Sequence, residues 1–214
     1  MLFAVGSTHF LVGAMAATWP ELAPAAMRSG ATQGRIFFTG SIFFTSAAWL
    51  QWLEALNGNV ATAFEKLPHR WRWFGFRPRD LGYLACTVQL LGTILFNVDT
   101  ADAMQTGLSS RQQDLLVWTP NMLGSLCFLV ASYLAYAEVS HGAASFAPRS
   151  ISWWIAIVNL AGSMAFQLSA LESFAGAGPA QPEAAFDATL FTALGAGGFL
   201  VGAYLLIPEL FDTD

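Results

Sequence analysis

One pattern recurs three times along this chain, with the same spacing in every copy. Each copy has a glycine, a phenylalanine four residues later and a glutamate fourteen residues after the glycine. The copies are Gly40, Phe44 and Glu54; Gly124, Phe128 and Glu138; and Gly195, Phe199 and Glu209. At 100° per residue, these three positions share one stripe of an α-helix. The pattern therefore predicts three equivalent helices, and such a repeat decides the fold.

A weaker relative precedes each copy. A glycine is again followed four residues later by a phenylalanine in three places: Gly6 and Phe10, Gly92 and Phe96, and Gly162 and Phe166. The two glycines of each pair are 34, 32 and 33 residues apart, which leaves room for two antiparallel helices and a loop. The predicted repeating unit is a helical hairpin, present over residues 1–54, 81–138 and 151–209.

The composition places these hairpins in a membrane. Hydrophobic residues make up 55% of the chain and charged residues 11%, against about 25% charged in an ordinary soluble domain. Six apolar stretches approach the roughly 20 residues that a membrane-crossing helix needs. They are 2–19, 34–54, 81–99, 119–138, 151–172 and 187–208. The sequence predicts an all-α membrane protein with six transmembrane helices in one domain, 1–214, and with Thr119–Pro120 opening the fourth helix.

Each predicted hairpin returns the chain to the side on which it started. Successive copies therefore share one orientation, and we expect a pseudo-three-fold arrangement about the membrane normal, unlike the inverted repeats of many transporters. The repeated glycines are expected to let neighbouring helices approach closely. The stripes would then face inward or toward the next hairpin.

The basic residues indicate how the chain is oriented. Six lie on the side of the termini, at 66, 70, 72, 77, 79 and 149, and three on the other, at 28, 35 and 111. Because Lys and Arg accumulate in cytoplasmic loops, both termini are predicted to be cytoplasmic. Gly6 lies only five residues after the start, so the first helix looks about two turns short at 3.6 residues per turn. Its start is either truncated or wrongly assigned.

Several classes of function are disfavoured. The net charge of -5 forms no basic surface, which argues against nucleic-acid binding. Cys86 and Cys127 fall inside different spans, and the three histidines have no metal-ligand spacing. No nucleophile elbow, phosphate loop or dinucleotide fingerprint occurs. We therefore expect no metal, no cofactor and no enzyme activity.

The three glutamates allow two interpretations. Glu54, Glu138 and Glu209 end their helices near the edge of the hydrocarbon core. They could form a carboxylate ring at one mouth of the bundle, of the kind that selects cations in channels. Alternatively, each carboxylate faces headgroups or pairs with a nearby arginine, since the cost of an ionised group falls toward the interface.

A second polar pattern runs through the first helix of each hairpin. It comprises Gln89, Thr93 and Asn97 in one helix and Asn159, Ser163 and Gln167 in another. In the first hairpin the same places hold Phe3, Ser7 and Leu11, so both amides are lost there. These stripes could line a hydrophilic route or binding site. They could equally join helices through side-chain hydrogen bonds.

Segment 69–79 interleaves basic and aromatic residues. It could recognise an acidic partner or lipid. The alternative is an interfacial anchor, with rings at headgroup level and arginines on anionic lipid.

Three segments carry a resemblance to known sequences: Val88–Asn97, Val117–Ser125 and Trp153–Ser163. With their Gly-Ser-x-x-Phe and Trp-x-Pro-Asn motifs, they resemble bacterial, actinobacterial-type multi-pass membrane proteins with YrhK-like hairpins. The resemblance covers about residues 35–209. It implies a bacterial plasma membrane and a bundle of hairpins, but no site residues, because those proteins are functionally uncharacterised.

Two functional classes remain. The first is a structural or accessory subunit that binds membrane lipid, a membrane-protein partner or a second copy of itself. The second is a small channel or transporter for ions or polar solutes, which would use the amide layer and the carboxylate ring. A pore requires a continuous wet path through the amide layer, so the coordinates can separate these classes.

Overall fold

The computed structural model describes residues 1–58, 71–140, 146–174 and 182–209. These residues are almost entirely helical, and no strand occurs among them. The elements are α1 (Leu2–Thr18), η1 (Ala25–Met27), α2 (Gly30–Asn57), α3 (Leu81–Asp102), α4 (Ser110–Gln113), η3 (Asp114–Trp118), α5 (Thr119–Val139), α6 (Ile151–Glu172) and α7 (Pro182–Glu209).

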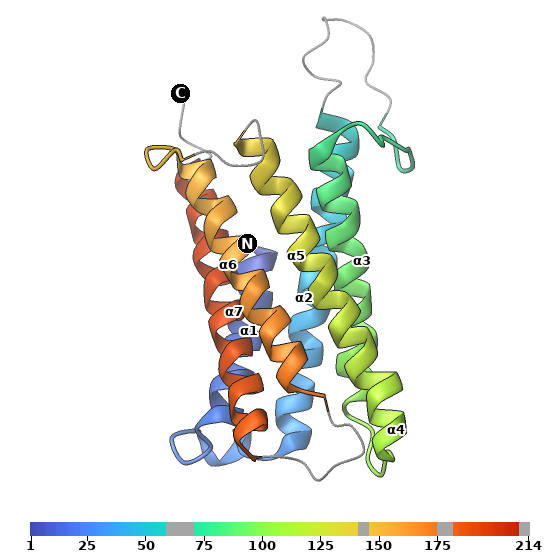
Figure 1. The fold of residues 1–214 in the computed structure, drawn as a ribbon, viewed down its shortest axis with the longest axis vertical. Helices are drawn as coiled ribbons and strands as arrows, with labels where there is room; N and C mark the ends of the chain where they lie inside the picture. The colour runs from blue at the N-terminus through green and yellow to red at the C-terminus, as the bar shows by residue number, and fades with distance from the viewer. Residues whose placement is uncertain (59–70, 141–145, 175–181, 210–214) are drawn as a thin grey trace, which may run out of the picture.

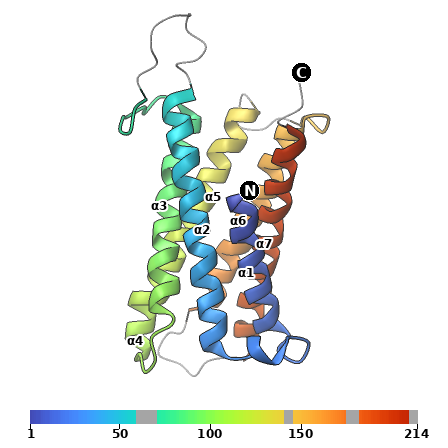
Figure 2. The same ribbon diagram turned by 180° about the vertical axis from the view of Figure 1, so that it is seen from behind.

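The long helices form a closed ring in chain order. Each packs against its neighbours in the sequence, and α7 packs against α1 to close the ring. Figure 1 and Figure 2 show the resulting bundle from opposite sides, with α1 beginning and α7 ending toward the same end. The first helix of each consecutive pair (α1, α3 and α6) runs one way, and the second (α2, α5 and α7) runs back. We call these pairs the first, second and third hairpin.

Within the described ranges, five helices are long and apolar enough to cross a membrane, namely α2, α3, the continuous helix Ser110–Val139, α6 and α7. The prediction of an all-α, multi-pass membrane protein is confirmed at this level. Helix α1 is also apolar but has 17 residues. The sixth crossing stays a prediction.

The fourth long helix starts earlier than the sequence indicated. We expected Thr119–Pro120 to open it, but the helix begins at Ser110, where Ser109 and Gln112 form a capping box. Pro120 has no N–H to donate, so the ordinary ladder cannot continue through it. The turn just before the proline is a π-helix, in which the Thr119 N–H bonds to the carbonyl of Asp114. Helix α5 does begin at Thr119 with Pro120 in its first turn, as predicted, but Thr119 is not a cap, because the π-turn joins α5 to the helical chain before it.

The repeated glycines mark where the two helices of each hairpin come closest. A Cβ on Gly124 would lie 3.2 Å from the carbonyl oxygen of Gly92, and one on Gly195 would lie 2.9 Å from that of Gly162. A Cβ on Gly6 would lie 3.1 Å from the carbonyl oxygen of Gly40. These separations are tighter than almost all real Cβ contacts, so a larger residue would force the neighbouring backbone to move. The expectation that the glycines permit close helix approach is confirmed.

The repeated phenylalanines fill the centre of the ring in two layers. In the first helices, the ring centroids of Phe10, Phe96 and Phe166 lie 6.2, 6.1 and 6.0 Å from one another. The second helices contribute Phe44, Phe128 and Phe199, whose centroids lie 6.4, 6.3 and 5.6 Å apart. Each phenylalanine lies four residues, or about 6 Å, beyond its glycine. Because the two sets of helices run in opposite directions, the layers fall on opposite sides of the glycine level.

Candidate functional site

A cavity of about 170 Å³ occupies the bundle axis at the end where α2, α5 and α7 terminate. Its floor is apolar, because Phe44, Phe128 and Phe199 of the second phenylalanine layer face it. The remaining lining residues are Phe3, Gln51, Gln89, Ser132, Ala135, Val139, Ser152, Ile155, Ala156, Asn159, Ala203, Leu206 and Glu209. At about 30 Å³ per molecule of liquid water, this volume holds roughly five to six waters.

Much of the lining comes from equivalent positions of the three hairpins. The residue three places before the glycine faces the cavity from every first helix, and these residues are Phe3, Gln89 and Asn159. The residue eleven places after the glycine faces it from every second helix, and these are Gln51, Ala135 and Leu206. The positions are shared but the side chains differ, so the wall is polar in some places and apolar in others.

Some polar groups of the cavity lining have hydrogen-bond partners among the described residues, and others do not. Ser152 at the start of α6 donates a hydrogen bond to the carboxylate of Glu209 at the end of α7. The Gln51 Oε1 atom is buried and has no hydrogen-bond partner among the described residues. The Asn159 side chain packs directly on Gly202, where an added Cβ would meet its Oδ1 atom at 2.5 Å. Together these groups present acceptors to the cavity, and the Glu209 carboxylate makes it acidic.

The predicted amide layer divides into three levels. Gln89 and Asn159 line the cavity. Thr93 and Ser163, one helical turn further on, are completely buried. Beyond them, Asn97 donates to the Thr45 hydroxyl at 2.8 Å, and the Gln167 carbonyl oxygen accepts from Ser125 at 3.2 Å. The cavity interpretation therefore fits the first level, and the interpretation as helix-joining hydrogen bonds fits the third.

Hydrogen bonds between hairpins recur at the two junctions that follow in sequence. At the α2–α3 junction, Ser41 and Thr100 share a buried hydrogen bond of 3.0 Å. At the α5–α6 junction, Ser132 and Ser163 share one of 2.7 Å. Such bonds supply attraction that the hydrophobic effect cannot supply between helices in lipid.

The three glutamates do not converge on the cavity. Of the three, only Glu209 lines it. The Glu138 side chain is exposed, and its carboxylate accepts a hydrogen bond from the backbone N–H of Gly82 in the first turn of α3. Glu209 likewise reaches the first turn of α6, through Ser152. Both carboxylates thus lie at the positive end of the preceding helix of their own hairpin, where a negative charge is stabilising.

Glu54 differs from its two equivalents. Its side chain is exposed, and it borders a shallow surface hollow with Trp71 rather than the central cavity. Helix α1 begins lower in the bundle than α3 and α6 (Figure 1), so it presents no first turn at the level of Glu54. The three glutamates therefore do not form a ring. Glu138 and Glu209 each contact the first turn of the neighbouring helix in their own hairpin, whereas Glu54 is exposed.

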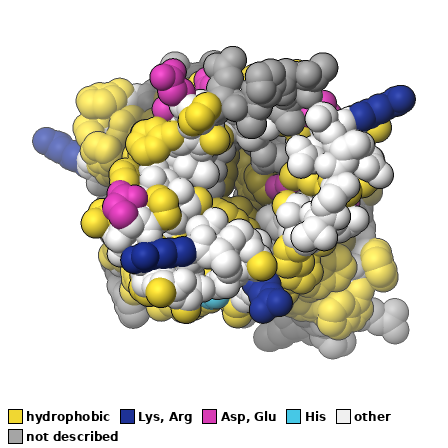
Figure 3. Space-filling model, turned by 90° about the horizontal axis from the view of Figure 1, so that it is seen from below, with side chains coloured by type: hydrophobic (Ala, Val, Ile, Leu, Met, Phe, Trp, Pro, Cys, Tyr) yellow, Lys and Arg dark blue, Asp and Glu magenta, His cyan; other side chains and the backbone are white. Residues whose placement is uncertain are grey.

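Beyond the cavity floor, the bundle axis is packed. Five of the six repeated phenylalanines are 4–5% exposed, and Ser7, Ser41, Thr93, Ser125, Ser163 and Ala196 are fully buried around them. The opposite end of the bundle has a separate hollow of about 210 Å³ near Asp114 and Trp118. Figure 3 views that end, where basic side chains lie mainly around the outer edge of the bundle. The phenylalanine layers lie between the two hollows.

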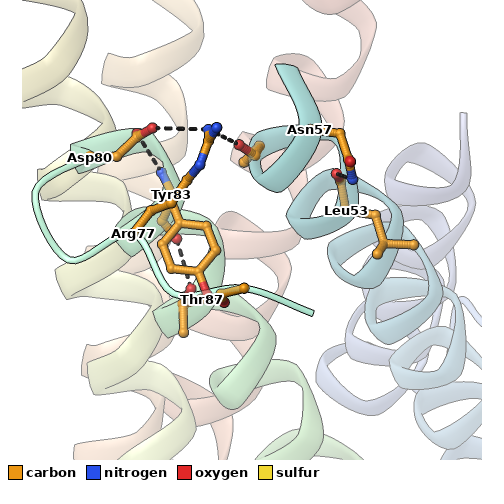
Figure 4. Close-up of polar contacts among 8 residues, drawn as sticks. Leu53, Asn57, Arg77, Asp80, Tyr83 and Thr87 are labelled. Carbon is orange, nitrogen blue, oxygen red and sulfur yellow. Dashed lines mark hydrogen bonds and ion pairs between the residues drawn. The ribbon is translucent and has the colours of Figure 1, made fainter. Parts of the chain in front are cut away.

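The segment just before α3 is tied to the end of α2, as Figure 4 shows. The Arg77 guanidinium donates to the Ala55 carbonyl at 3.1 Å and pairs with Asp80 at 3.6 Å. The Tyr83 hydroxyl donates to the Gly75 carbonyl at 2.7 Å, and Asn57 bonds both backbone groups of Arg72. The aromatic side chains of this segment, at 71, 73, 74 and 76, are at least 51% exposed. Residues 69 and 70 lie outside the described part of the chain.

Sequence reasoning missed Gln51, Ser132 and Ser152 as cavity residues. A signal for Gln51 was present, because it is an amide among apolar neighbours at a fixed distance from its repeated glycine. Ser152 carried no comparable signal, since serine at the start of a helix ordinarily serves as a cap. Its role became visible only when α7 placed Glu209 beside it.

Comparisons of the chain with protein-family models, curated proteins and solved structures return no match. The resemblance to YrhK-like hairpins therefore stays a prediction.

Proposed function

We propose that this chain is a non-conducting accessory subunit of a bacterial plasma membrane, which binds a lipid or a membrane-protein partner on its outer surface. The observation that carries the proposal is the phenylalanine packing on the bundle axis. Phe10, Phe96 and Phe166 form one layer and the three equivalents of the second helices form another, with centroid separations of 6.5 Å or less. Rings at this spacing leave no room for water between them.

The proposed architecture is three equivalent hairpins about a pseudo-three-fold axis, with six crossings. Three findings support it: the near-equal sides of the two phenylalanine triangles, the glycine contact within each hairpin, and the equivalent positions that line the cavity. Helix α1 has 17 residues and is about 26 Å long at 1.5 Å per residue. That length is close to the roughly 30 Å hydrocarbon core, which supports a sixth crossing.

The proposed binding surface is an outward groove between α2 and α3. It has a volume of about 460 Å³ and is lined by Ile42, Thr45, Ser46, Trp49, Leu50, Leu90, Ile94 and Asn97. Its walls are apolar apart from a few short polar groups, and the Asn97 Oδ1 atom at its base is buried without a partner among the described residues. An acyl chain would fill this groove without donating to that oxygen, whereas a partner helix carrying a hydroxyl would fill the groove and could also donate to it.

Substitution inside and outside the groove tests this surface. Ser46→Trp would fill the groove, whereas Val130→Trp places the same ring at the equivalent position of α5, outside the groove residues. We expect co-purified lipid or protein, measured by native mass spectrometry, to be lost from Ser46→Trp and retained by Val130→Trp. Wild-type protein that purifies alone, with neither lipid nor partner, would contradict the proposal.

A channel or transporter is the second candidate, and the acidic cavity favours it. Gln89, Asn159 and Glu209 form a polar entrance to the bundle axis, and the phenylalanine layers would then be a gate. Liposome flux of ions and small solutes tests this directly, with wild type compared against the Glu54→Gln/Glu138→Gln/Glu209→Gln variant. We expect background leakage for both. Selective flux that the triple variant abolishes would establish the channel instead.

The remaining predictions from the sequence fit the same proposal. The exposed aromatic segment 71–76 would lie at headgroup level on the cytoplasmic side, where its arginines meet anionic lipid. Both termini would be cytoplasmic, and no enzyme activity is proposed. Accessibility of a tag at each terminus in sealed membrane vesicles tests this orientation.

A further inference from the structure

We propose that the central cavity is a binding site for a small organic cation, namely a primary ammonium group attached to an aromatic or branched apolar body. The inference rests on the charge, the acceptors, the walls and the size of the cavity. It is independent of whether the protein has a partner, because the cavity lies on the bundle axis and the groove between α2 and α3 lies on the outside.

The charge of the cavity selects the sign of the ligand. Glu209 is the only charged residue among the described residues that line it, and they include no lysine, arginine or histidine. From the described residues the Glu209 carboxylate accepts one hydrogen bond, from Ser152, whereas an ionised carboxylate has about four lone-pair sites. The carboxylate therefore attracts a cation and retains acceptor capacity for it. An anionic ligand would meet uncompensated repulsion.

The second acceptor is the side chain of Gln51. Its Oε1 atom is buried without a partner in the described part of the chain, although it belongs to a residue of the cavity wall. The oxygen itself is shielded from the cavity, so a ligand reaches it when the Gln51 side chain turns inward, and such a turn is favoured because it pairs an acceptor that is otherwise buried without a partner. An ammonium group brings three donors and no acceptor, which matches a cavity with acceptors to spare.

The walls and the volume select the body of the ligand. Phe3, Phe44, Phe128 and Phe199 give the cavity an aromatic floor and side. Aromatic faces attract organic cations, and they also pack against an apolar body. An apolar cavity of about 150 Å³ admits benzene, so about 170 Å³ admits a single ring or a branched chain of similar size. A bare metal ion fits poorly, because the phenylalanine floor supplies no oxygen ligands and no metal-binding cluster occurs among the described residues.

The test uses three probes of one shape. Benzylammonium, benzyl alcohol and benzoate share a ring and differ in charge, and each is titrated calorimetrically into the protein in lipid nanodiscs. We expect saturable binding of benzylammonium, weaker binding of benzyl alcohol and none of benzoate. Loss of one charged hydrogen bond, worth about 1.5–3 kcal/mol, predicts that Glu209→Gln weakens benzylammonium binding by roughly tenfold to a hundredfold.

Two further variants keep the result interpretable. Glu54→Gln removes the equivalent glutamate of the first hairpin, which lies outside the cavity, and should leave affinity unchanged. Ala135→Phe fills the cavity without altering its charge and should abolish binding even if Glu209→Gln proves unstable. Saturable binding that is equal for the ammonium and the alcohol, or equal in wild type and Ala135→Phe, would overturn the proposal. Absence of saturable binding by wild type would also overturn it.

Discussion

The middle and the hollow end of this bundle are built by the same three hairpins, yet one is solid and the other is not. In the middle, every hairpin contributes the same residues, and their phenylalanine rings fill the axis. At the end, equivalent positions carry unlike side chains: Gln51, Ala135 and Leu206 in the second helices, and Phe3, Gln89 and Asn159 in the first. Where the copies agree they make a packed core. Where the side chains of the copies differ, they leave a cavity with both polar and apolar walls.

The largest effect is expected in the phenylalanine core. Phe128 contacts the rings of Phe44, Phe96, Phe166 and Phe199, so Phe128→Ala would leave a void that its neighbours cannot all fill. We expect a loss of about 3 kcal/mol, at the lower end for such changes because exposure to lipid carries no hydrophobic penalty. Reversible unfolding in mixed micelles measures it. Phe3→Ala, in the cavity wall, should lower the free energy of unfolding far less. Equal losses for the two variants would contradict the difference in packing between the middle and the hollow end.

A smaller effect is expected at the glycine contacts. In Gly195→Ala the new methyl group would lie 2.7 Å from the Phe166 ring and 2.9 Å from the Gly162 carbonyl oxygen. Overpacking of this kind costs about 1–3 kcal/mol. Gly197→Ala on the same helix meets nothing within 4 Å and should be neutral or stabilising by up to about 1 kcal/mol, because alanine is the better helix former. Because helix propensity favours alanine over glycine, a control as destabilised as Gly195→Ala would show that the close contacts at Gly195 are not the cause of the loss.

The smallest effect is expected at the buried hydroxyls. Ser41 bonds to Thr100 across the α2–α3 junction, whereas the hydroxyl of Ser7, which follows the repeated glycine of α1, is buried without a partner among the described residues. A Ser41→Ala and Thr100→Val double-mutant cycle should give a coupling of about 0.6 kcal/mol, typical of interhelical hydrogen bonds in membranes. Ser7→Ala should be neutral or slightly stabilising, because it removes an unsatisfied group. A destabilised Ser7→Ala would mean that this hydroxyl has a partner after all.

The sequence was most informative where one residue type is required in every copy. Residues 151–172 were predicted as a helix with the bounds that the structure has, and the repeated glycines permit close helix approach as expected. The glycines nevertheless pack on the other helix of their own hairpin, and not on the next hairpin as one of the two expectations had it. The helical segment Ser110–Trp118 before the fourth predicted helix was missed, because Pro120 is compatible with a helix start and with a π-turn. Local sequence does not distinguish the two.

The candidate site was only partly predictable. Gln89 and Asn159 were identified as polar residues inside spans, and both line the cavity. The surroundings of the glutamates could not be predicted, because they depend on which helix start each carboxylate meets. Glu138 meets Gly82, Glu209 meets Ser152, and Glu54 meets neither. Spacing along one helix carries no information about the height at which its neighbour begins.

The central claim is that the cavity ends at the phenylalanine layers. Substituted-cysteine labelling tests it most directly, in a Cys86→Ala/Cys127→Ala background in oriented vesicles with a membrane-impermeant thiol reagent. Asn159→Cys lies at the cavity and should react from one face only, whereas Ser163→Cys, one turn deeper at a fully buried position, should react from neither until the protein is unfolded in detergent. Comparable labelling at both positions, or labelling of Asn159→Cys from both faces, would contradict the account.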